Sequence, residues 1–224
     1  MNGFFADRAD AGRRLGHDLR QYANRPDVIV LALPPGGVAV ARAVAEALHA
    51  PLDVLMVRKL GVPGHEQLAM GAVSTGGLEF RDRSVMSAFE ISREHFDAAV
   101  RREQAELIRR ERVYRGDRPF PSLRGKTVIL VDDGLAADSP VRAALRALQL
   151  KHAAAIVVAT PIATDQMVQA LRREVADVVT VLMPAHLLAV GEFYDNFQPP
   201  TDDEVRELLA PPDVQPADLP LSLR

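Results

Sequence analysis

Two neighbouring carboxylates, Asp132 and Asp133, follow a short apolar run and stand directly before a loop of small residues. The run 127–131 reads TVILV and predicts a buried strand, and the loop from Gly134 to Pro140 leads into a predicted helix. Amides at a helix N-terminus can hold a phosphate, and paired carboxylates can accept hydrogen bonds from ribose hydroxyls. The segment therefore suits a phosphorylated sugar, although two such acids could equally be a polar strand end.

A second loop of small residues, Pro34 to Gly37, reads PPGG and follows the apolar run 28–33. Its glycines would let backbone amides approach an anion closely. A third run, 54–57, is followed by Arg58 and Lys59. Ligands of parallel α/β sheets bind outside the carboxyl ends of the strands. We therefore expect the loops that begin at Pro34, Lys59, Asp132 and Pro161 to gather at one edge.

The elements that must position these loops are apolar strands alternating with amphipathic helices. Five runs predict strands, at 28–33, 54–57, 127–131, 155–159 and 178–182. Continuous apolar strands of this kind are typical of a parallel sheet covered on both faces. Two regions differ from this alternation. Met70 to Phe80 reads as a hairpin, and Glu90 to Arg115 predicts a long charged helix that is solvated rather than a nucleic-acid surface. Thr201 to Glu204 predicts a capping box that opens a helix ending at Leu209.

The segment from Val128 to Pro140 resembles the phosphoribosyl-diphosphate (PRPP) signature of type I phosphoribosyltransferases, in which Asp-Asp precedes a Thr-Gly-x-Thr phosphate loop. Nearly the whole chain resembles a bacterial group of phosphoribosyltransferases of unsettled substrate. The matching stretches are DRADAGRRL at 7–15, LPPGGV at 33–38, PLDVLMVRKLGVP at 51–63, LAMGA at 68–72 and AVGEFY at 189–194. The resemblance implies an α/β fold with a parallel sheet flanked by helices, a small hood and a flexible hairpin loop.

The same resemblance implies a role for each matching residue. Asp132 and Asp133 would face the ribose hydroxyls and, indirectly, a magnesium ion. The 5-phosphate loop would comprise Gly134, Ala136, Ala137, Asp138 and Ser139. Pyrophosphate would contact Pro35, Gly36, Gly37 and Arg58. The catalytic residues would be Lys59, His65 and Asp133, with the basic side chains stabilising the departing pyrophosphate. Phe193 and Tyr194 would lie in the hood, where core packing or a dimer contact is favoured over stacking on a base.

The sequence departs from the family pattern at the phosphate contacts. The loop carries Ala137, Asp138 and Pro140 where the family has Thr, Gly and Thr, and Pro35 stands where relatives have Arg. Each lost charge-assisted hydrogen bond is worth about 1.5–3 kcal/mol, and a carboxylate about 4 Å from a phosphate charge costs about 4 kcal/mol at an effective dielectric of 20. Ser139 is also a favourable N-cap, and Pro140 is a favourable first helical residue. We therefore expect weakened phosphate binding and a helix that caps itself.

Three functional hypotheses follow from these residues. The first is transfer of a 5-phosphoribosyl group from PRPP to a nucleobase-like acceptor, with release of pyrophosphate, in nucleotide metabolism, impaired by the altered loop. The second is an inactive nucleotide-binding, regulatory or partner-binding module on the same fold. The third is a loop altered by design to disable an active parent. Magnesium is the cofactor that the resemblance implies, and PRPP, or another phosphorylated sugar or nucleotide, is the implied ligand.

Composition narrows the class of protein. With 224 residues we expect one domain at 1–210, its hood built from the N-terminal segment and about 184–210, and a poorly ordered Pro-rich tail at 211–224. A formal net charge of -3 gives no bulk attraction to nucleic acid or membrane. The chain has no cysteine and no apolar run of about 18 residues. We expect a cytoplasmic homodimer that binds neither nucleic acid nor membrane.

Overall fold

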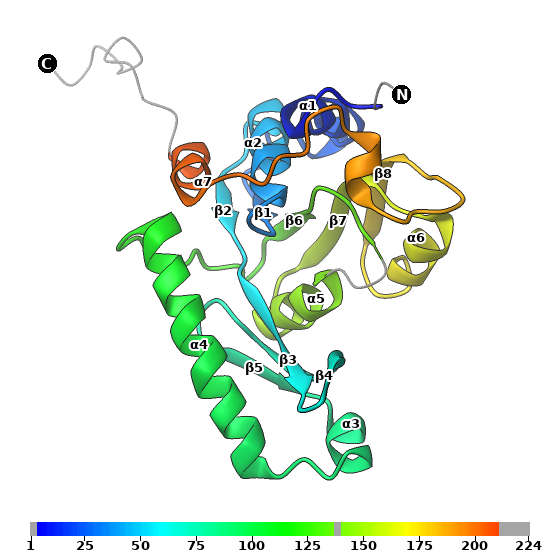
Figure 1. Cartoon of the computed structure of the whole chain (residues 1–224). Helices are drawn as coiled ribbons and strands as arrows, with labels where there is room; N and C mark the ends of the chain where they lie inside the picture. The colour runs from blue at the N-terminus through cyan, green and yellow to red at the C-terminus, as the bar shows by residue number, and fades with distance from the viewer. Residues whose placement is uncertain (1–3, 137–139, 211–224) are drawn as a thin grey trace, which may run out of the picture.

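The computed structural model describes residues 4–136 and 140–210, and its largest element is a five-stranded parallel sheet (Figure 1). The strand order is β2-β1-β6-β7-β8. The strands are β1 (Val28–Ala32), β2 (Leu52–Val54), β6 (Thr127–Val131), β7 (Ala155–Ile162) and β8 (Asp177–Leu182). The chain leaves β1 for β2 on one side and later returns to β6 on the other, so the strand order reverses between β1 and β6. Such a reversal creates a crevice at the carboxyl ends of the strands. The predicted α/β architecture is confirmed.

Helices cover both faces of this sheet, as the alternation of its buried side chains requires. Val28, Val30 and Ala32 share one buried cluster with residues of α1 (Arg8–Asp18) and α2 (Gly37–Leu48). Ile29 and Leu31 share the other cluster with residues of α5 (Val141–Leu150) and α6 (Asp165–Leu171). Both faces of β1 are therefore in apolar contact, which explains why its sequence is a continuous apolar run rather than an alternating one.

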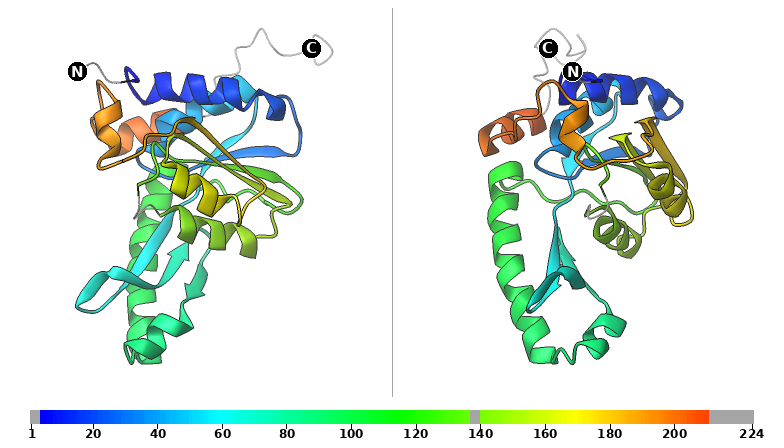
Figure 2. Two further views of the ribbon diagram at one scale, coloured as in Figure 1. Left: turned by 90° about the vertical axis from the view of Figure 1, so that its right-hand side faces the viewer. Right: turned by 45° about the vertical axis from the view of Figure 1, so that its right-hand side comes forward.

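An arm of residues 57–115 projects from the sheet (Figures 1 and 2). It contains a three-stranded antiparallel sheet of β3 (Val57–Val62), β4 (His65–Ser74) and β5 (Leu78–Arg81), followed by α3 (Arg83–Ala88) and α4 (Arg93–Arg115). The predicted hairpin is confirmed as β4 and β5. Leu60, Met70 and Phe96 of the arm belong to the same buried cluster as Val30 and Ile129 of the sheet. The arm and the α1–α2 layer therefore share a continuous core.

Several predicted elements differ in their bounds. Strand β7 continues to Ile162, so Pro161, where a loop was expected to begin, lies within the strand. The apolar run 54–57 is not one strand: β2 ends at Val54 and β3 begins at Val57. Between them, Met56 exchanges hydrogen bonds of 2.9 Å with Thr75, one to the Oγ1 atom and one from the backbone N–H, so the chain is fixed as it passes from one sheet to the other. The helix predicted from Glu90 begins at Arg93, because Ser92 caps it through His95 N and Glu90 has a positive φ of 51°.

The return of the chain from the arm is fixed by Arg115 at the end of α4. Its Nε lies 2.9 Å from Asp53 Oδ1, its Nη2 donates to the Val54 carbonyl at 2.8 Å, and its Nη1 lies 3.3 Å from Glu111 Oε1. The Arg115 side chain is 5% exposed. A buried guanidinium bonded to both side chain and backbone holds the base of α4 against strand β2.

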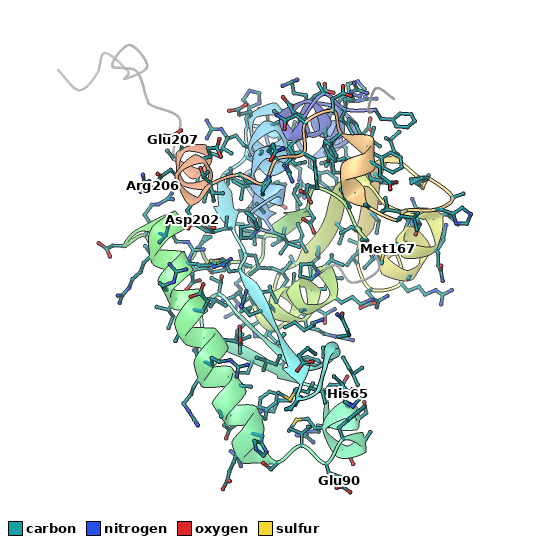
Figure 3. All side chains as sticks on the ribbon, in the orientation of Figure 1. His65, Glu90, Met167, Asp202, Arg206 and Glu207 are labelled. Atoms are coloured by element: carbon teal, nitrogen blue, oxygen red, sulfur yellow. The ribbon has the colours of Figure 1, made fainter. Side chains whose placement is uncertain are left out.

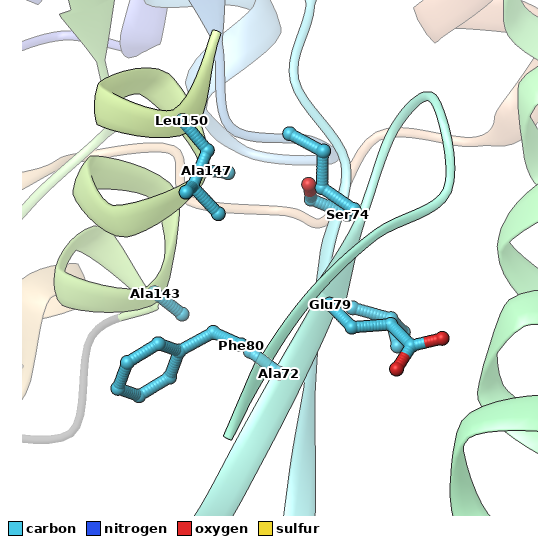
Figure 4. A pocket seen from close by; sticks show the side chains of 9 residues that line it. Ala72, Ser74, Glu79, Phe80, Ala143, Ala147 and Leu150 are labelled. Carbon is cyan, nitrogen blue, oxygen red and sulfur yellow. The ribbon is translucent and has the colours of Figure 1, made fainter. Parts of the chain in front are cut away.

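Helix α5 packs against the hairpin of the arm (Figure 4). A small cavity of about 10 Å³ lies between them, with Ala143 and Ala147 on the helix side and Ala72, Ser74 and Phe80 on the arm. Within residues 4–136 and 140–210, the buried Ser74 hydroxyl has no hydrogen-bond partner. The cavity is large enough for one water molecule beside that hydroxyl.

The end of the described chain returns to its beginning. Phe5 pairs with Tyr194 in a parallel bridge, just after the short helix η2 (Val190–Phe193), and the other short helix, η1 (Arg20–Tyr22), follows α1. The last helix, α7 (Asp202–Leu209), opens with the predicted capping box of Thr201 and Glu204. No helix in the described part of the chain is long and apolar enough to cross a membrane.

Candidate active site

A cavity of about 450 Å³ opens at the carboxyl ends of β1 and β6, where the strand order reverses. Its walls come from the loops after these two strands, from the start of α1, and from η2 and the segment that follows it. The lining residues are Arg8, Leu33, Pro34, Pro35, Gly36, Asp132, Asp133, Gly134, Ala136, Pro140, Val190, Phe197, Pro199 and Pro200. Of the positions that the sequence singled out as a site, the structure therefore brings the PPGG loop and the Asp132–Asp133 segment together.

Asp133 lines this cavity and is paired with Arg8. Arg8 Nε lies 2.8 Å from Asp133 Oδ2, and the two side chains are 10% and 15% exposed. Arg8 Nη1 donates to the Gln198 carbonyl at 2.7 Å, and the guanidinium carbon lies 3.9 Å from the centre of the Phe197 ring. Arg8 is thus held on three sides, and its charge is directed at the carboxylate.

The backbone of Asp133 is fixed as well. The Tyr194 hydroxyl donates to the Asp133 carbonyl at 2.6 Å. Burial, together with the nearby negative charge of Asp133, raises the pKa of Tyr194 well above its ordinary value. The phenol therefore remains a neutral donor. Tyr194 is buried, with its ring packed against those of Phe5 and Phe197.

The PPGG loop touches the acid loop because its glycines have no side chains. An added Cβ at Gly36 would overlap the Asp133 carboxylate, and one at Gly37 would lie 2.8 Å from the Val131 carbonyl. Gly134 is closed in by Val190 in the same way. These glycines allow the two loops and η2 to meet, which is a structural requirement besides any contact with phosphate. The peptide bond between Pro34 and Pro35 is cis.

Asp132, Ala136 and Pro140 complete this wall. Asp132 Oδ1 accepts from the Asp133 amide at 3.0 Å, and the Asp132 amide donates to the Ala159 carbonyl of β7. Pro140 lines the cavity with helical backbone angles and is the N-cap of α5, which begins at Val141, so the helix starts one residue later than predicted. The predictions for Ala137, Asp138 and Ser139 concern positions outside the described residues.

Arg58, Lys59 and His65 lie on the arm and do not line the cavity. Arg58 pairs with Glu103 of α4 at 2.8 Å, and Lys59 Nζ donates to the Gln67 carbonyl. Burial alone would raise the pKa of Glu103, but hydrogen bonds from Arg58 and Arg102 outweigh burial and hold this pKa below its usual value. His65 lies near the far end of the arm, its ring 5.3 Å from that of Phe89 (Figure 3). Arg58 and Lys59 are thus in strand β3, whereas a loop was expected to begin at Lys59.

The carboxylates of Asp132 and Asp133 could hold magnesium only together with oxygens from a ligand. Among the residues that the structure describes, no group of three His, Cys, Asp or Glu side chains is placed to bind a metal ion. Magnesium in proteins commonly binds through one or two carboxylates plus substrate phosphates and waters. The donor set therefore fits a magnesium ion that a diphosphate brings with it.

A parallel sheet that carries paired acids and a glycine loop where its strand order reverses belongs to the class of α/β proteins whose ligands bind at the carboxyl ends of the strands. Residues 6–186 match the family profile described as a phosphoribosyl transferase domain. The chain therefore belongs to the phosphoribosyl transferase family.

Two Mycobacterium tuberculosis proteins, from strains CDC 1551 and H37Rv, both bear the name "Putative phosphoribosyl transferase". Each is 40% identical to this chain over 201 residues, or 90% of the chain. The chain spans 45% of the length of these relatives. The crystal structure of TT1426 from Thermus thermophilus is 35% identical, with a TM-score of 0.82, over 93% of this chain and 98% of that one.

Arg8 is the charged lining residue that sequence reasoning missed. It lies within the matching stretch DRADAGRRL, where no role was assigned to it. Its two partners, Asp133 and Gln198, are 125 and 190 residues away in the chain. An arginine at the first position of a helix was the available signal, because a cation there faces the positive end of the helix dipole and needs a partner elsewhere.

Proposed function

We propose that the cavity binds the 5-phosphoribosyl part of PRPP and supports its transfer to a nucleobase-like acceptor. In this reaction the bond from ribose C1 to the diphosphate oxygen breaks, a bond from C1 to an acceptor nitrogen forms, and pyrophosphate leaves. The observation that carries the proposal is the contact between Gly36 and Asp133, which brings a glycine loop and paired acids together at the strand-order reversal.

In this proposal, different residues bind different parts of the ligand. Asp132 and Asp133 accept hydrogen bonds from the ribose hydroxyls, and the loop from Gly134 to Pro140 faces the 5-phosphate. The PPGG loop faces pyrophosphate. Magnesium, when bound to the diphosphate, would neutralise charge on the leaving group. Arg58, Lys59 and His65 would reach pyrophosphate only if the arm bends toward the cavity, since none of them lines it.

Transfer is proposed to be impaired. Pro35 and Pro140 line the cavity, and neither residue offers a backbone N–H to an anion. Among the described lining residues, the charged ones are Arg8, Asp132 and Asp133, so their summed formal charge is negative by one unit. A phosphate would meet fewer donors here than at a loop with glycine and threonine, and a deficit of about 3 kcal/mol corresponds to more than a hundredfold in affinity.

Calorimetric titration of PRPP with Mg²⁺ tests this reading. The protein should be compared with a restored variant carrying Ala137→Thr, Asp138→Gly and Pro140→Thr. We expect the restored variant to bind at least tenfold more tightly, and the addition of Asp133→Asn to it to remove most of that gain. Equal affinity of the original and restored proteins would contradict an impaired loop.

A second candidate is a non-catalytic, nucleotide-binding or partner-binding module, favoured by the pairing of Asp133 with Arg8. The two candidates differ in turnover. Pyrophosphate release from PRPP with nucleobases, above the level of an Asp133→Asn blank, would support the transferase. Binding of a nucleoside monophosphate with no release above the blank would support the module.

A further inference from the structure

We propose that Arg8 is the resident counter-ion of Asp133, so that the sugar half of a ligand binds at this carboxylate without a divalent cation. The inference rests on the proposed function for the identity of the ligand, and on the structure for the charge balance. Arg8 acts here as a positioning residue, because it fixes and neutralises the acid that would contact ribose.

The first step is that Asp133 Oδ2 already has a partner. Arg8 Nε lies 2.8 Å from this oxygen, and the same carboxylate lies against the backbone of Gly36, where even a methyl group would not fit. A magnesium ion requires near-octahedral coordination at about 2.0–2.1 Å from each oxygen. The space around Oδ2 is already taken by a guanidinium on one side and by backbone on the other.

The second step is the rigidity of Arg8. Its Nη1 bond to the Gln198 carbonyl is 2.7 Å long, its guanidinium stacks on Phe197 at 3.9 Å, and its side chain is 10% exposed. A guanidinium is planar, permanently charged and weakly hydrated, so it is well suited to a buried pair of this kind. An arriving cation would have to displace a side chain that is held by three groups.

The third step is the charge around Asp133. The described part of the lining holds two acids and one arginine, so a divalent cation would meet there a net formal charge of only minus one, with a positive charge already beside Asp133. Arg8 is also the first residue of α1, where the positive end of the helix dipole adds to its own charge. Electrostatics at Asp133 therefore disfavour a second cation.

The experiment uses two probes, ribose 5-phosphate and Mn²⁺, on the full chain. Ribose 5-phosphate should be titrated calorimetrically in Mg²⁺ and in EDTA. We expect the original protein to show less than a twofold difference between the two conditions. Arg8→Gln should lose at least tenfold in EDTA and recover part of this loss in Mg²⁺. Arg8→Lys, which keeps the charge without the planar contacts, should lose less than Arg8→Gln and show the same small difference between Mg²⁺ and EDTA as the original. Arg13→Gln, which alters an exposed pair with Asp10 on the same helix, is the matched control.

Mn²⁺ alone tests the counter-ion without any sugar. Paramagnetic broadening of the amide resonances of Asp132, Asp133 and Gly134 should appear in Arg8→Gln and be absent from the original protein and from Arg13→Gln. A strict Mg²⁺ requirement for ribose 5-phosphate in the original protein, or Mn²⁺ broadening there, would overturn the inference. If ribose 5-phosphate and PRPP bind to none of the proteins, the proposed function fails, while the Mn²⁺ result still decides the role of Arg8.

If Arg8→Gln does not fold, the original protein and Arg8→Lys carry the test. A lysine keeps the charge but cannot donate to Asp133, Gln198 and the Phe197 face in the same planar arrangement. Cation-independent sugar binding by the original protein, together with no Mn²⁺ broadening in it, supports the inference. The opposite result in either measurement overturns it.

Discussion

Because Gly36 has no side chain, the loop after β1 can lie against the carboxylate of Asp133. At the scale of single residues, the form of the cavity depends on glycines that lack a side chain and on one buried arginine, Arg8. The sequence alone suggested that the glycines serve phosphate approach. The structure gives Gly36, Gly37 and Gly134 a prior task, since each faces an atom of another loop, strand or helix at a distance that excludes a Cβ.

Gly36→Ala tests this task. The added methyl group must displace Asp133 from Arg8, so we expect a loss of about 1–3 kcal/mol in the free energy of unfolding and loss of ligand binding. Urea unfolding and calorimetry measure the two effects. Gly125→Ala is the control: its φ of 75° makes alanine costly, but no atom stands within 4 Å of the added Cβ. Gly125→Ala should lose stability and keep binding, and unchanged binding in Gly36→Ala would contradict the argument.

At the scale of elements, helix α4 is tied at one end to strand β2 by Arg115 and to α7 by Tyr114. Arg115 holds Asp53 and the Val54 carbonyl, and the Tyr114 hydroxyl donates to Asp202 Oδ1 at 2.6 Å. Both contacts join residues more than 60 positions apart in the sequence. They hold the base of the arm, so their loss should loosen the arm before the parallel sheet.

Arg115→Ala should destabilise the protein strongly. The change leaves Asp53, whose side chain is 13% exposed, without its cation, and removal of one partner of a buried pair costs about 3–5 kcal/mol. Urea unfolding measures the loss, and amide exchange should show faster opening of α4 and β3 than of β6. Arg112→Ala, an exposed position on the same helix, should change stability by less than about 0.5 kcal/mol. Similar losses in both variants would contradict the role of Arg115.

The raised pKa of Tyr114 predicts that the stability of the protein falls at alkaline pH. Burial, and then the hydrogen bond to Asp202, raise the pKa of Tyr114 to about 12 from the value of about 10 expected in the unfolded chain. The stability that this tyrosine contributes is therefore complete below pH ~10 and is lost as the pH rises toward ~12. Unfolding free energies of the protein and of Tyr114→Phe, measured between pH 8 and pH 11, should converge as the pH rises. A constant difference would contradict the prediction.

The sequence was most informative where local pattern decides structure. Continuous apolar runs identified the strands of the parallel sheet, because both faces of that sheet are covered, and Thr201 with Glu204 identified the start of α7. The run 54–57 was misread because its division depends on Thr75, which holds Met56 from another element. The local sequence around 54–57 does not reveal this contact with Thr75.

At the scale of the whole molecule, the shared core of the arm and the sheet predicts a single unfolding transition. The chain contains no tryptophan, so an introduced one is the sole reporter of its kind. Phe89→Trp in the arm and Phe4→Trp near the N-terminus are both at exposed positions. Urea midpoints of the two variants, each measured by fluorescence and by circular dichroism, should coincide within each protein. An earlier fluorescence transition in Phe89→Trp would show that the arm unfolds separately.

Only part of the candidate site could be predicted from the sequence, because some of its residues meet through contacts between distant segments of the chain. Asp132, Asp133, Gly36 and Gly37 could be found because each follows a recognisable strand. Arg8 could not be assigned a role, since its contacts with Asp133 and Gln198 depend on how three distant segments meet. Arg58, Lys59 and His65 were assigned to the site by resemblance alone. In the structure all three lie on the arm, where Arg58 pairs with α4, Lys59 donates to β4 and the His65 ring lies near that of Phe89.

The tie between Arg8, Asp133, Tyr194 and Gln198 also has a consequence for the order of synthesis. A ribosome delivers Arg8 early, Asp133 125 residues later, and Tyr194 a further 61 residues on. The ligand cavity cannot close until Gln198 has left the exit tunnel. A nascent chain stalled before this point would leave Arg8 without its Gln198 contact, and would acquire its ligand site only when the segment around Gln198 has emerged.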